Sequence, residues 1–196
     1  MTEAQTAPTV TSVRFNPRSN THAGSLARLH RDYLLEETTR LGYHAPGMPL
    51  AAWLNTFLIT VDDIPVGYCA ADHTRYAIEL IYIEPTWRGR GLASHLLRDL
   101  MATCPQPMQI KAPLSPGGEA LARTLGLEVS EPTAEELATA MEIARDLNAT
   151  IARHCQHRRK SGNPSKPCLR CYRNVINTSA ANVVLTYCRA VRLGVA

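Results

Sequence analysis

A glycine-broken turn, placed between an apolar run and a helical pattern, constrains the fold of this chain more than any other feature. The run YAIELIYI at 76–83 is rich in strand-forming residues, and Pro85 follows it. The turn reads RGRGLA at 88–93, and apolar residues then recur at helical spacing. Glycines let a backbone approach an anion, and a helix start offers unpaired N–H groups and a positive dipole end. This layout predicts a phosphate-binding loop between a strand and a helix.

The spacing of the turn excludes two common phosphate-binding motifs. A Walker loop ends in Gly-Lys-Ser/Thr, and a dinucleotide fingerprint needs three glycines. The turn instead fits the pattern Gln/Arg-x-x-Gly-x-Gly/Ala, with Arg88, Gly91 and Ala93 in the fixed places. An ordinary glycine turn that enters a helix is the alternative, and the neighbouring elements bear on the choice.

The elements predicted around the turn follow a definite order. Two β-rich runs flank a short polar turn and predict a hairpin. After the strand and the loop come a helix, a strand, a second helix that ends at Gly126, and a further strand. The predicted ranges are 56–61 and 65–70 for the hairpin, 76–83 for the next strand, then 92–103, 108–112, 117–125 and 127–129.

This order and this motif resemble the GCN5-related N-acetyltransferase (GNAT) superfamily over residues 10–130. The segment LGLE at 125–128 is similar to the Leu-Gly-Phe-Glu common in that family. The resemblance implies an α/β (α+β) fold, with a central mixed and twisted sheet of about six to seven strands flanked by helices. Residues 131–196 are predicted to add a long helix, a Cys/His knuckle and a basic C-terminal segment. The run 182–191 is either a last helix or a seventh core strand.

The resemblance also implies the co-substrate, acetyl-CoA, and direct transfer of its acetyl group to an amine of unidentified acceptor. The backbone of the strand end is expected to bind the pantetheine arm, and the loop is expected to bind the pyrophosphate through its amides. The expected contacts are Ile81, Tyr82 and Ile83 for the arm, and Arg88, Gly89, Arg90, Gly91, Leu92, Ala93 and Ser94 for the pyrophosphate.

Proton transfer needs a base for the amine and an acid for the departing thiolate. The strand before the loop commonly supplies the base in this family, which makes Glu79 the candidate; alternation puts it on one face with Ile81 and Ile83. The position where many members carry a tyrosine holds Ala122, which donates no proton. Ser115 is the candidate acid, with Tyr82 or a water molecule as alternatives. The competing interpretation is a catalytically weak scaffold that binds nucleic acid or another partner.

Charge is divided unevenly along the chain. Residues 1–146 hold 12 of the 21 Lys and Arg residues and all 17 Asp and Glu residues, a net charge of −5. Residues 147–196 hold 9 Lys and Arg residues and no acidic residue, a net charge of +9. Basic residues within 153–173 predict contacts with nucleic acid, whose affinity would fall with salt. A solubility patch and a dock for the acidic core are the alternatives.

The C-terminal segment carries a pattern typical of a zinc site. Thr133 and Glu136 form a capping box that predicts a helix over 134–157. The end of that helix holds His154, Cys155 and His157, and a Cys-x-x-Cys pair, Cys168 and Cys171, follows. Such a pair facing His or Cys ligands is a tetrahedral zinc arrangement. Which of His154, Cys155 and His157 complete the set stays open, and Cys188 is a further candidate.

Nothing in the sequence predicts a membrane protein. No apolar run approaches the ~20 residues of a membrane span. The first residues, Met1–Thr11, lack the basic start and apolar stretch of a secretory signal and are predicted to form a short loose arm. We therefore expect a cytoplasmic protein, in which the 6 cysteines are thiols or metal ligands rather than disulfides.

Overall fold

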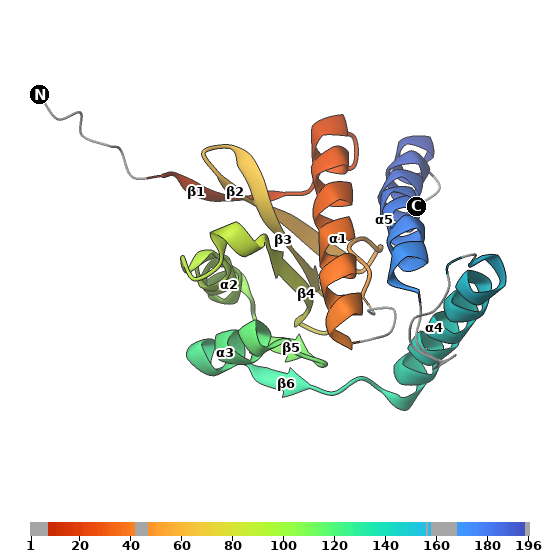
Figure 1. The fold of residues 1–196 in the computed structure, drawn as a ribbon. Helices are drawn as coiled ribbons and strands as arrows, with labels where there is room; N and C mark the ends of the chain where they lie inside the picture. The colour runs from red at the N-terminus through yellow and green to blue at the C-terminus, as the bar shows by residue number, and fades with distance from the viewer. Residues whose placement is uncertain (1–7, 42–46, 156, 158–167, 195–196) are drawn as a thin grey trace, which may run out of the picture.

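The computed structural model describes residues 8–41, 47–155, 157 and 168–194 (Figure 1). Its centre is a mixed six-stranded sheet whose strands lie in chain order. The strands are β1 (Val10–Arg14), β2 (Leu54–Val61), β3 (Ile64–Asp72), β4 (Ala77–Ile83), β5 (Gln109–Lys111) and β6 (Glu128–Ser130). The pairs from β1 to β4 are antiparallel, and β4–β5 and β5–β6 are parallel. The predicted mixed sheet flanked by helices is confirmed.

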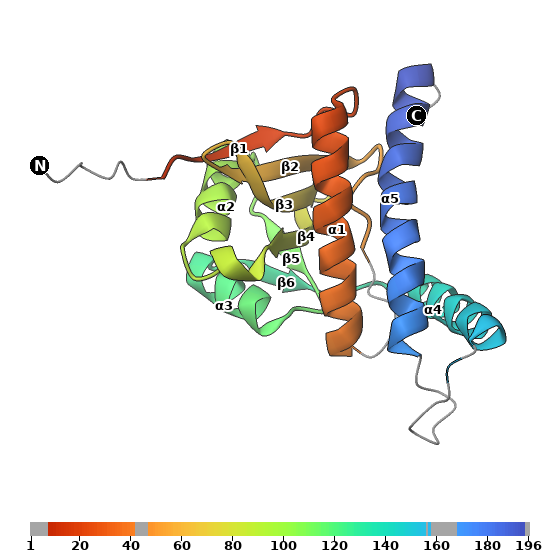
Figure 2. The ribbon, with the colours of Figure 1, turned by 45° about the horizontal axis from the view of Figure 1, so that its top comes forward.

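Helices cover both faces of this sheet (Figure 2). On one face α2 (Leu92–Thr103) and α3 (Pro116–Leu125) bury apolar side chains against Ile59, Val66 and Ile78. On the other face lie α1 (Asn20–Leu41) and α5 (Leu169–Leu193), which run side by side in both views. The remaining helices are α4 (Ala134–His154) and a 3-10 turn at Pro85–Trp87. None of the helices within the described ranges is long and apolar enough to cross a bilayer.

The strand that leads to the glycine loop, β4, contains a β-bulge and pairs with β5 over only part of its length. Ala70 pairs with Leu80 and Ala71 pairs with Ile78, so Glu79 is the extra residue of β4. β4 pairs with β5 only through Ala77 and Ile78. The rest of β4 therefore has β3 on one side and no strand of the described residues on the other.

The C-terminal run is helical, so the alternative of a seventh core strand is wrong. Buried residues recur along α5 at every fourth position: Ile176, Ala180, Val184 and Cys188. In a strand Asn182 and Thr186 would share their face, yet both are exposed, as a helix requires. Val184 and Cys188 pack with Leu26 and Leu29 of α1, so the end of the chain shares the core of the sheet domain.

Helix α4 begins where the sequence predicts but ends earlier. Thr133 and Glu136 form the predicted capping box. The helix ends at His154, three residues before the predicted 157, and Cys155 is its C-cap. The apolar residues Leu137, Met141 and Ile143 of this helix are exposed, whereas Ile151 is buried beside α1 and α5.

Strand β1 corrects the prediction for the N-terminus. Val10 and Thr11 pair with Val61 and Thr60 of β2, so the end of the predicted loose arm is an edge strand. The other boundaries agree with the predicted ranges to within two residues. The division at residue 130 stays a prediction.

Candidate functional site

The glycine loop and the start of α2 together have a backbone geometry that is suited to binding an anion. Gly89 and Gly91 have φ values of 73° and 76°, a left-handed conformation that favours glycine. Gly91 is the N-cap of α2, and no side chain caps the helix. The first intrahelical bond runs from the His95 N–H to the Gly91 carbonyl. The N–H groups of Leu92, Ala93 and Ser94 precede it and have no acceptor among the described residues, so they can bind a ligand at the positive end of the helix dipole.

The arginine side chains of the loop hold its shape rather than face the amides. Arg88 donates from Nε to the Ile83 carbonyl at 2.9 Å and from both Nη atoms to Glu36 of α1, at 2.7 and 2.6 Å. Hydrogen bonding to Glu36 raises the pKa of Arg88. Arg90 donates to the Thr86 carbonyl and stacks over Trp87, 4.5 Å from the ring centre. Arg88 is thus anchored to β4 and α1, and Arg90 is anchored to the 3-10 turn before the loop.

The end of β4 lies beside this loop and keeps one edge open. Ile81, Tyr82 and Ile83 pair with Cys69, Tyr68 and Gly67 of β3. β5 does not extend this far along β4, because its pairing stops at Ile78. Backbone groups on that side are available to an extended ligand such as a pantetheine arm.

Glu79 lies in an ion-pair cluster rather than beside Ile81 and Ile83. Its carboxylate accepts from the Lys111 ammonium at 3.0 and 3.1 Å, and the same ammonium reaches Glu136 of α4 at 2.9 Å. Lys111 follows the core residue Ile110 on β5, so it faces the opposite side of the sheet. The bulge at Glu79 thus interrupts the alternation assumed from the sequence.

The pKa values of the cluster follow from these contacts. Burial acts to lower the pKa of Lys111, but hydrogen bonds to Glu136 and Glu79 raise it above its ordinary value. The bond from Lys111 and the backbone bond from Thr133 lower the pKa of Glu136 to about 2. Sequence reasoning missed Lys111, although its place on a short strand parallel to β4 follows from the predicted order.

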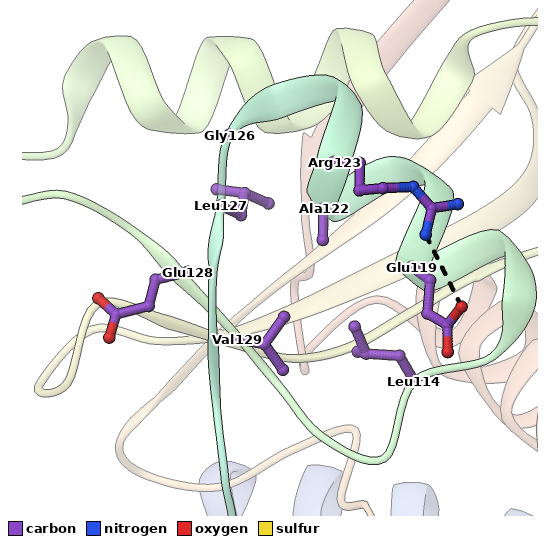
Figure 3. Close-up of a pocket in the computed structure, with 8 residues that line it drawn as sticks. All are labelled: Leu114, Glu119, Ala122, Arg123, Gly126, Leu127, Glu128 and Val129. Atoms are coloured by element: carbon purple, nitrogen blue, oxygen red, sulfur yellow. Dashed lines mark ion pairs between the residues drawn. The ribbon is translucent and has the colours of Figure 1, made fainter.

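Ser115 and Ala122 lie at the start and in the last turns of the same helix, α3. Ser115 is the N-cap of this helix, and its Oγ accepts the Gly118 N–H at 3.2 Å. Ala122 lines a shallow hollow of about 450 Å³ between α3 and β6 (Figure 3). The hollow has an apolar floor with Leu114 and Val129, and an ion pair between Glu119 and Arg123 at 3.9 Å lies at its rim.

A second hollow, of about 630 Å³, adjoins the glycine loop and contains three carboxylates. We call it the acidic groove. It lies between α1, the end of β4 and the first turn of α5, and its lining residues are Asp32, Leu35, Glu36, Thr39, Tyr82, Glu84, Pro85, Thr86 and Arg173. The sequence reasoning missed its acidic members, although Asp32 and Glu36 are one helical turn apart.

Each carboxylate of the acidic groove has an arginine partner. Asp32 accepts from Arg31, Glu36 from Arg88 and Glu84 from Arg28. A carboxylate has about four lone-pair sites, so each keeps acceptor capacity toward the groove. Burial, followed by the charge of Glu36, raises the pKa of Tyr82 to about 12. The Tyr82 hydroxyl is therefore a protonated donor at neutral pH.

Four predicted metal ligands come together at the junction of α4 and α5. Cys155, His157, Cys168 and Cys171 offer ligand atoms that all lie within 4.8 Å of one another. The backbone N–H of Cys171 lowers the pKa of Cys168, and burial raises the pKa of Cys171 to about 11. Cys188 is buried in the core and is not part of this group.

Some predicted residues lie outside the part of the chain that the structure describes. The His154 side chain is one of them, so its role as a ligand stays a prediction. The basic residues Arg158, Arg159, Lys160 and Lys166 are others, and the predicted nucleic-acid contact within 153–173 stays untested.

One family of known proteins matches the sequence from α1 to β5. Residues 25–113 match the sequence profile described as the Acetyltransferase (GNAT) family. A search of curated proteins found no match.

Solved structures with similarity include an aminoglycoside N-acetyltransferase, AAC(6')-Iy, in complex with CoA. It is 15% identical, with a TM-score of 0.36, covering 84% of this chain and 99% of that chain. The same enzyme with the bisubstrate analogue CoA-S-monomethyl-acetylneamine is 16% identical, with a TM-score of 0.34 and coverage of 82% and 99%. An integron cassette protein from the mobile metagenome of V. cholerae is 14% identical, with a TM-score of 0.31 and coverage of 79% and 94%.

Proposed function

We propose that this chain, whose residues 25–113 match the acetyltransferase (GNAT) family, transfers the acetyl group of acetyl-CoA to an amine bound in the acidic groove. The observation that carries the proposal is the uncapped start of α2 behind two left-handed glycines. That backbone is shaped for a pyrophosphate.

Acetyl-CoA is bound along one line of the molecule. The amides of Leu92, Ala93 and Ser94 receive the pyrophosphate, and the open edge of β4 at residues 81–83 receives the pantetheine arm. The thioester then lies in the gap between β4 and β5, where the two strands stop pairing. These contacts use backbone groups, so the side-chain identities at these positions are free to vary.

The acceptor amine approaches from the acidic groove. An ammonium group is a hydrogen-bond donor with positive charge, and Asp32, Glu36 and Glu84 supply acceptors of opposite charge around Tyr82. The Arg88–Glu36 pair joins this groove to the glycine loop. The proposed acetyl-CoA site and the proposed amine site are therefore adjacent, with the Arg88–Glu36 pair between them.

The reaction needs two proton movements. A base takes a proton from the ammonium, and the neutral amine attacks the thioester carbonyl. The C–N bond forms, the C–S bond breaks, and the thiolate of CoA takes up a proton. Glu79 stays the predicted base, acting through water from the Lys111 cluster. For the acid, Tyr82 is favoured over Ser115 because Tyr82 lines the groove and Ser115 caps a helix.

The Gly91→Glu variant tests the donor site. A carboxylate at the N-terminus of α2 is compatible with the helix dipole but occupies the site of the pyrophosphate. We expect acetyl-CoA binding, measured by titration calorimetry, to weaken by about 100-fold or more, which is about 2.7 kcal/mol.

Gly194→Glu is the matched control. Gly194 also has a positive φ, of 73°, and open space for a Cβ, so it brings the same strain and the same charge at the end of α5. It should bind acetyl-CoA like the natural chain. Equal affinity in all three proteins, or no binding by the natural chain, would refute the proposal.

A further inference from the structure

The junction of α4 and α5 brings together four soft metal ligands from two separate elements. Cys155 is the C-cap of α4, and His157 follows two residues later. Cys168 is the N-cap of α5, and Cys171 lies in its first turn. The end of α4 and the start of α5 therefore each supply two of the four ligands.

The distances within this group match a tetrahedron. His157 Nδ1 lies 3.2 Å from the Cys171 sulfur, 3.7 Å from the Cys168 sulfur and 4.0 Å from the Cys155 sulfur. Zn–S bonds of about 2.3 Å and Zn–N bonds of about 2.1 Å give tetrahedral edges of about 3.6 Å between N and S. The three observed distances lie on both sides of that value.

The chemistry of the ligands selects the ion. Three thiols and one imidazole form a Cys₃His set, which is a common structural zinc site. Hard cations such as Mg²⁺ and Ca²⁺ prefer oxygen ligands, and this group offers none. All four ligand positions are filled by protein, so a bound ion keeps no open position for catalysis.

We propose that Cys155, His157, Cys168 and Cys171 bind one structural Zn²⁺ ion, which fastens the end of α4 to the start of α5. The ion fixes the first turn of α5, where Tyr172 packs into a cluster with Leu34 and Ile151. Arg173, in the same turn, lines the acidic groove. The site is separate from the glycine loop, so metal binding and acetyl-CoA binding are independent.

Metal analysis of the full chain tests the proposal. Protein purified without a polyhistidine tag from zinc-supplemented medium should contain about one zinc per chain. Cys168→Ser should lower the zinc content several-fold. Cys104→Ser is the matched control, because Cys104 is a half-buried thiol at the end of α2, outside the group, and it should keep its zinc.

Two further measurements keep the outcome decisive. Co²⁺ bound to the natural chain should give the visible bands of a tetrahedral thiolate site, and His157→Ala should lose them even if Cys168→Ser does not fold. Removing zinc by chelation should speed hydrogen exchange at residues 169–176 and leave acetyl-CoA affinity unchanged.

The proposal is overturned if the natural chain binds no zinc, or if a disulfide joins Cys168 and Cys171 in the purified protein. Zinc content that is equal in the natural chain, Cys168→Ser and His157→Ala would overturn it as well. If the natural chain contains zinc but does not bind acetyl-CoA, the proposed function is wrong and the zinc site still stands.

Discussion

At the scale of single residues, Arg88 shapes the loop whose backbone we propose to bind the pyrophosphate. Its three directed hydrogen bonds join the loop to Ile83 and to Glu36 of α1. A lysine ammonium is a point charge and cannot make this forked set of hydrogen bonds, so the arginine is needed to fix the position of the loop. The proposed choice of acid rests on the same scale, because Tyr82 and Ser115 each have a hydroxyl but only Tyr82 lines the groove.

Substitutions at three residues separate the proton-transfer roles. We expect Glu79→Gln and Tyr82→Phe each to lower kcat by about 100-fold, the usual contribution of a general base or acid. Ser115→Ala should instead cost about 1 kcal/mol of stability, as the loss of a helix cap does, and leave kcat unchanged. Steady-state kinetics with a panel of amines, read by release of the free thiol, checks all three.

The controls remove similar groups elsewhere. Lys111→Met breaks the same ion pair as Glu79→Gln but keeps the carboxylate, so a purely structural role of Glu79 predicts equal losses in both. Tyr187→Phe removes a tyrosine hydroxyl outside the groove. If Ser115→Ala loses kcat and Tyr82→Phe does not, then Ser115 is the acid.

At the scale of elements, the first turn of α4 is tied to the sheet by charge. Glu136 belongs to the capping box and also accepts from Lys111 of β5 and Arg75, at 2.9 Å each. The Lys111 ammonium also bonds to Glu79, so ion pairs join the start of α4, the strand β5 and the bulge of β4. The rest of α4 is largely exposed until Ile151.

The stability contributed by Glu136 depends on pH. Its pKa is about 2 in the folded chain and near 4.5 ordinarily, so the unfolded chain binds the proton first as pH falls. The contribution is complete above pH 4.5 and is lost as pH falls toward 2. We expect Glu136→Gln to lower the free energy of unfolding at about pH 7 and to differ less from the natural chain at about pH 3, by urea denaturation.

Glu135→Gln is the matched control for this change. It removes the same charge from the same helical turn, and no hydrogen bond of its side chain is found among the described residues. It should show no comparable pH dependence. An equal penalty for Glu136→Gln at both pH values would contradict the linkage.

At the scale of the whole molecule, the C-terminal helix completes the core. The sheet has α2 and α3 on one face, and α1 with α5 on the other (Figure 2). Without α5, the buried surface of α1 that meets Val184 and Cys188 would be open to water. The helix also supplies a wall of the acidic groove, so fold and site depend on the same segment.

Neighbouring valines of α5 test this dependence. Val184 is 0% exposed and Val183 is 42% exposed. Val184→Ala should lower the free energy of unfolding by about 2 kcal/mol, through lost burial and a cavity, within a single unfolding transition. Val183→Ala should change it by less than about 0.5 kcal/mol. Two separate transitions, or equal effects, would show that α5 is not part of the core.

The agreement between predicted and observed elements has a local origin. The hairpin, the strand at 77–83, the glycine loop and the helices after it follow from patterns within about ten to twenty residues. The Cys/His group was also visible, because two close pairs were enough to indicate it. The helix end at His154 was missed, because no glycine or proline stands between His154 and Gly162 to mark it in the sequence.

The sequence alone determined the geometry of the glycine loop, because its left-handed backbone and uncapped helix start depend on the glycines and on the helix-forming residues directly after them. It also determined the capping box of α4, which is a contact within four residues. Only the tertiary structure decided which face Glu79 occupies, that the run 182–191 is part of a helix, and that α1, β4 and α5 line a groove. These depend on a bulge and on burial between residues far apart in the chain, which no local pattern encodes.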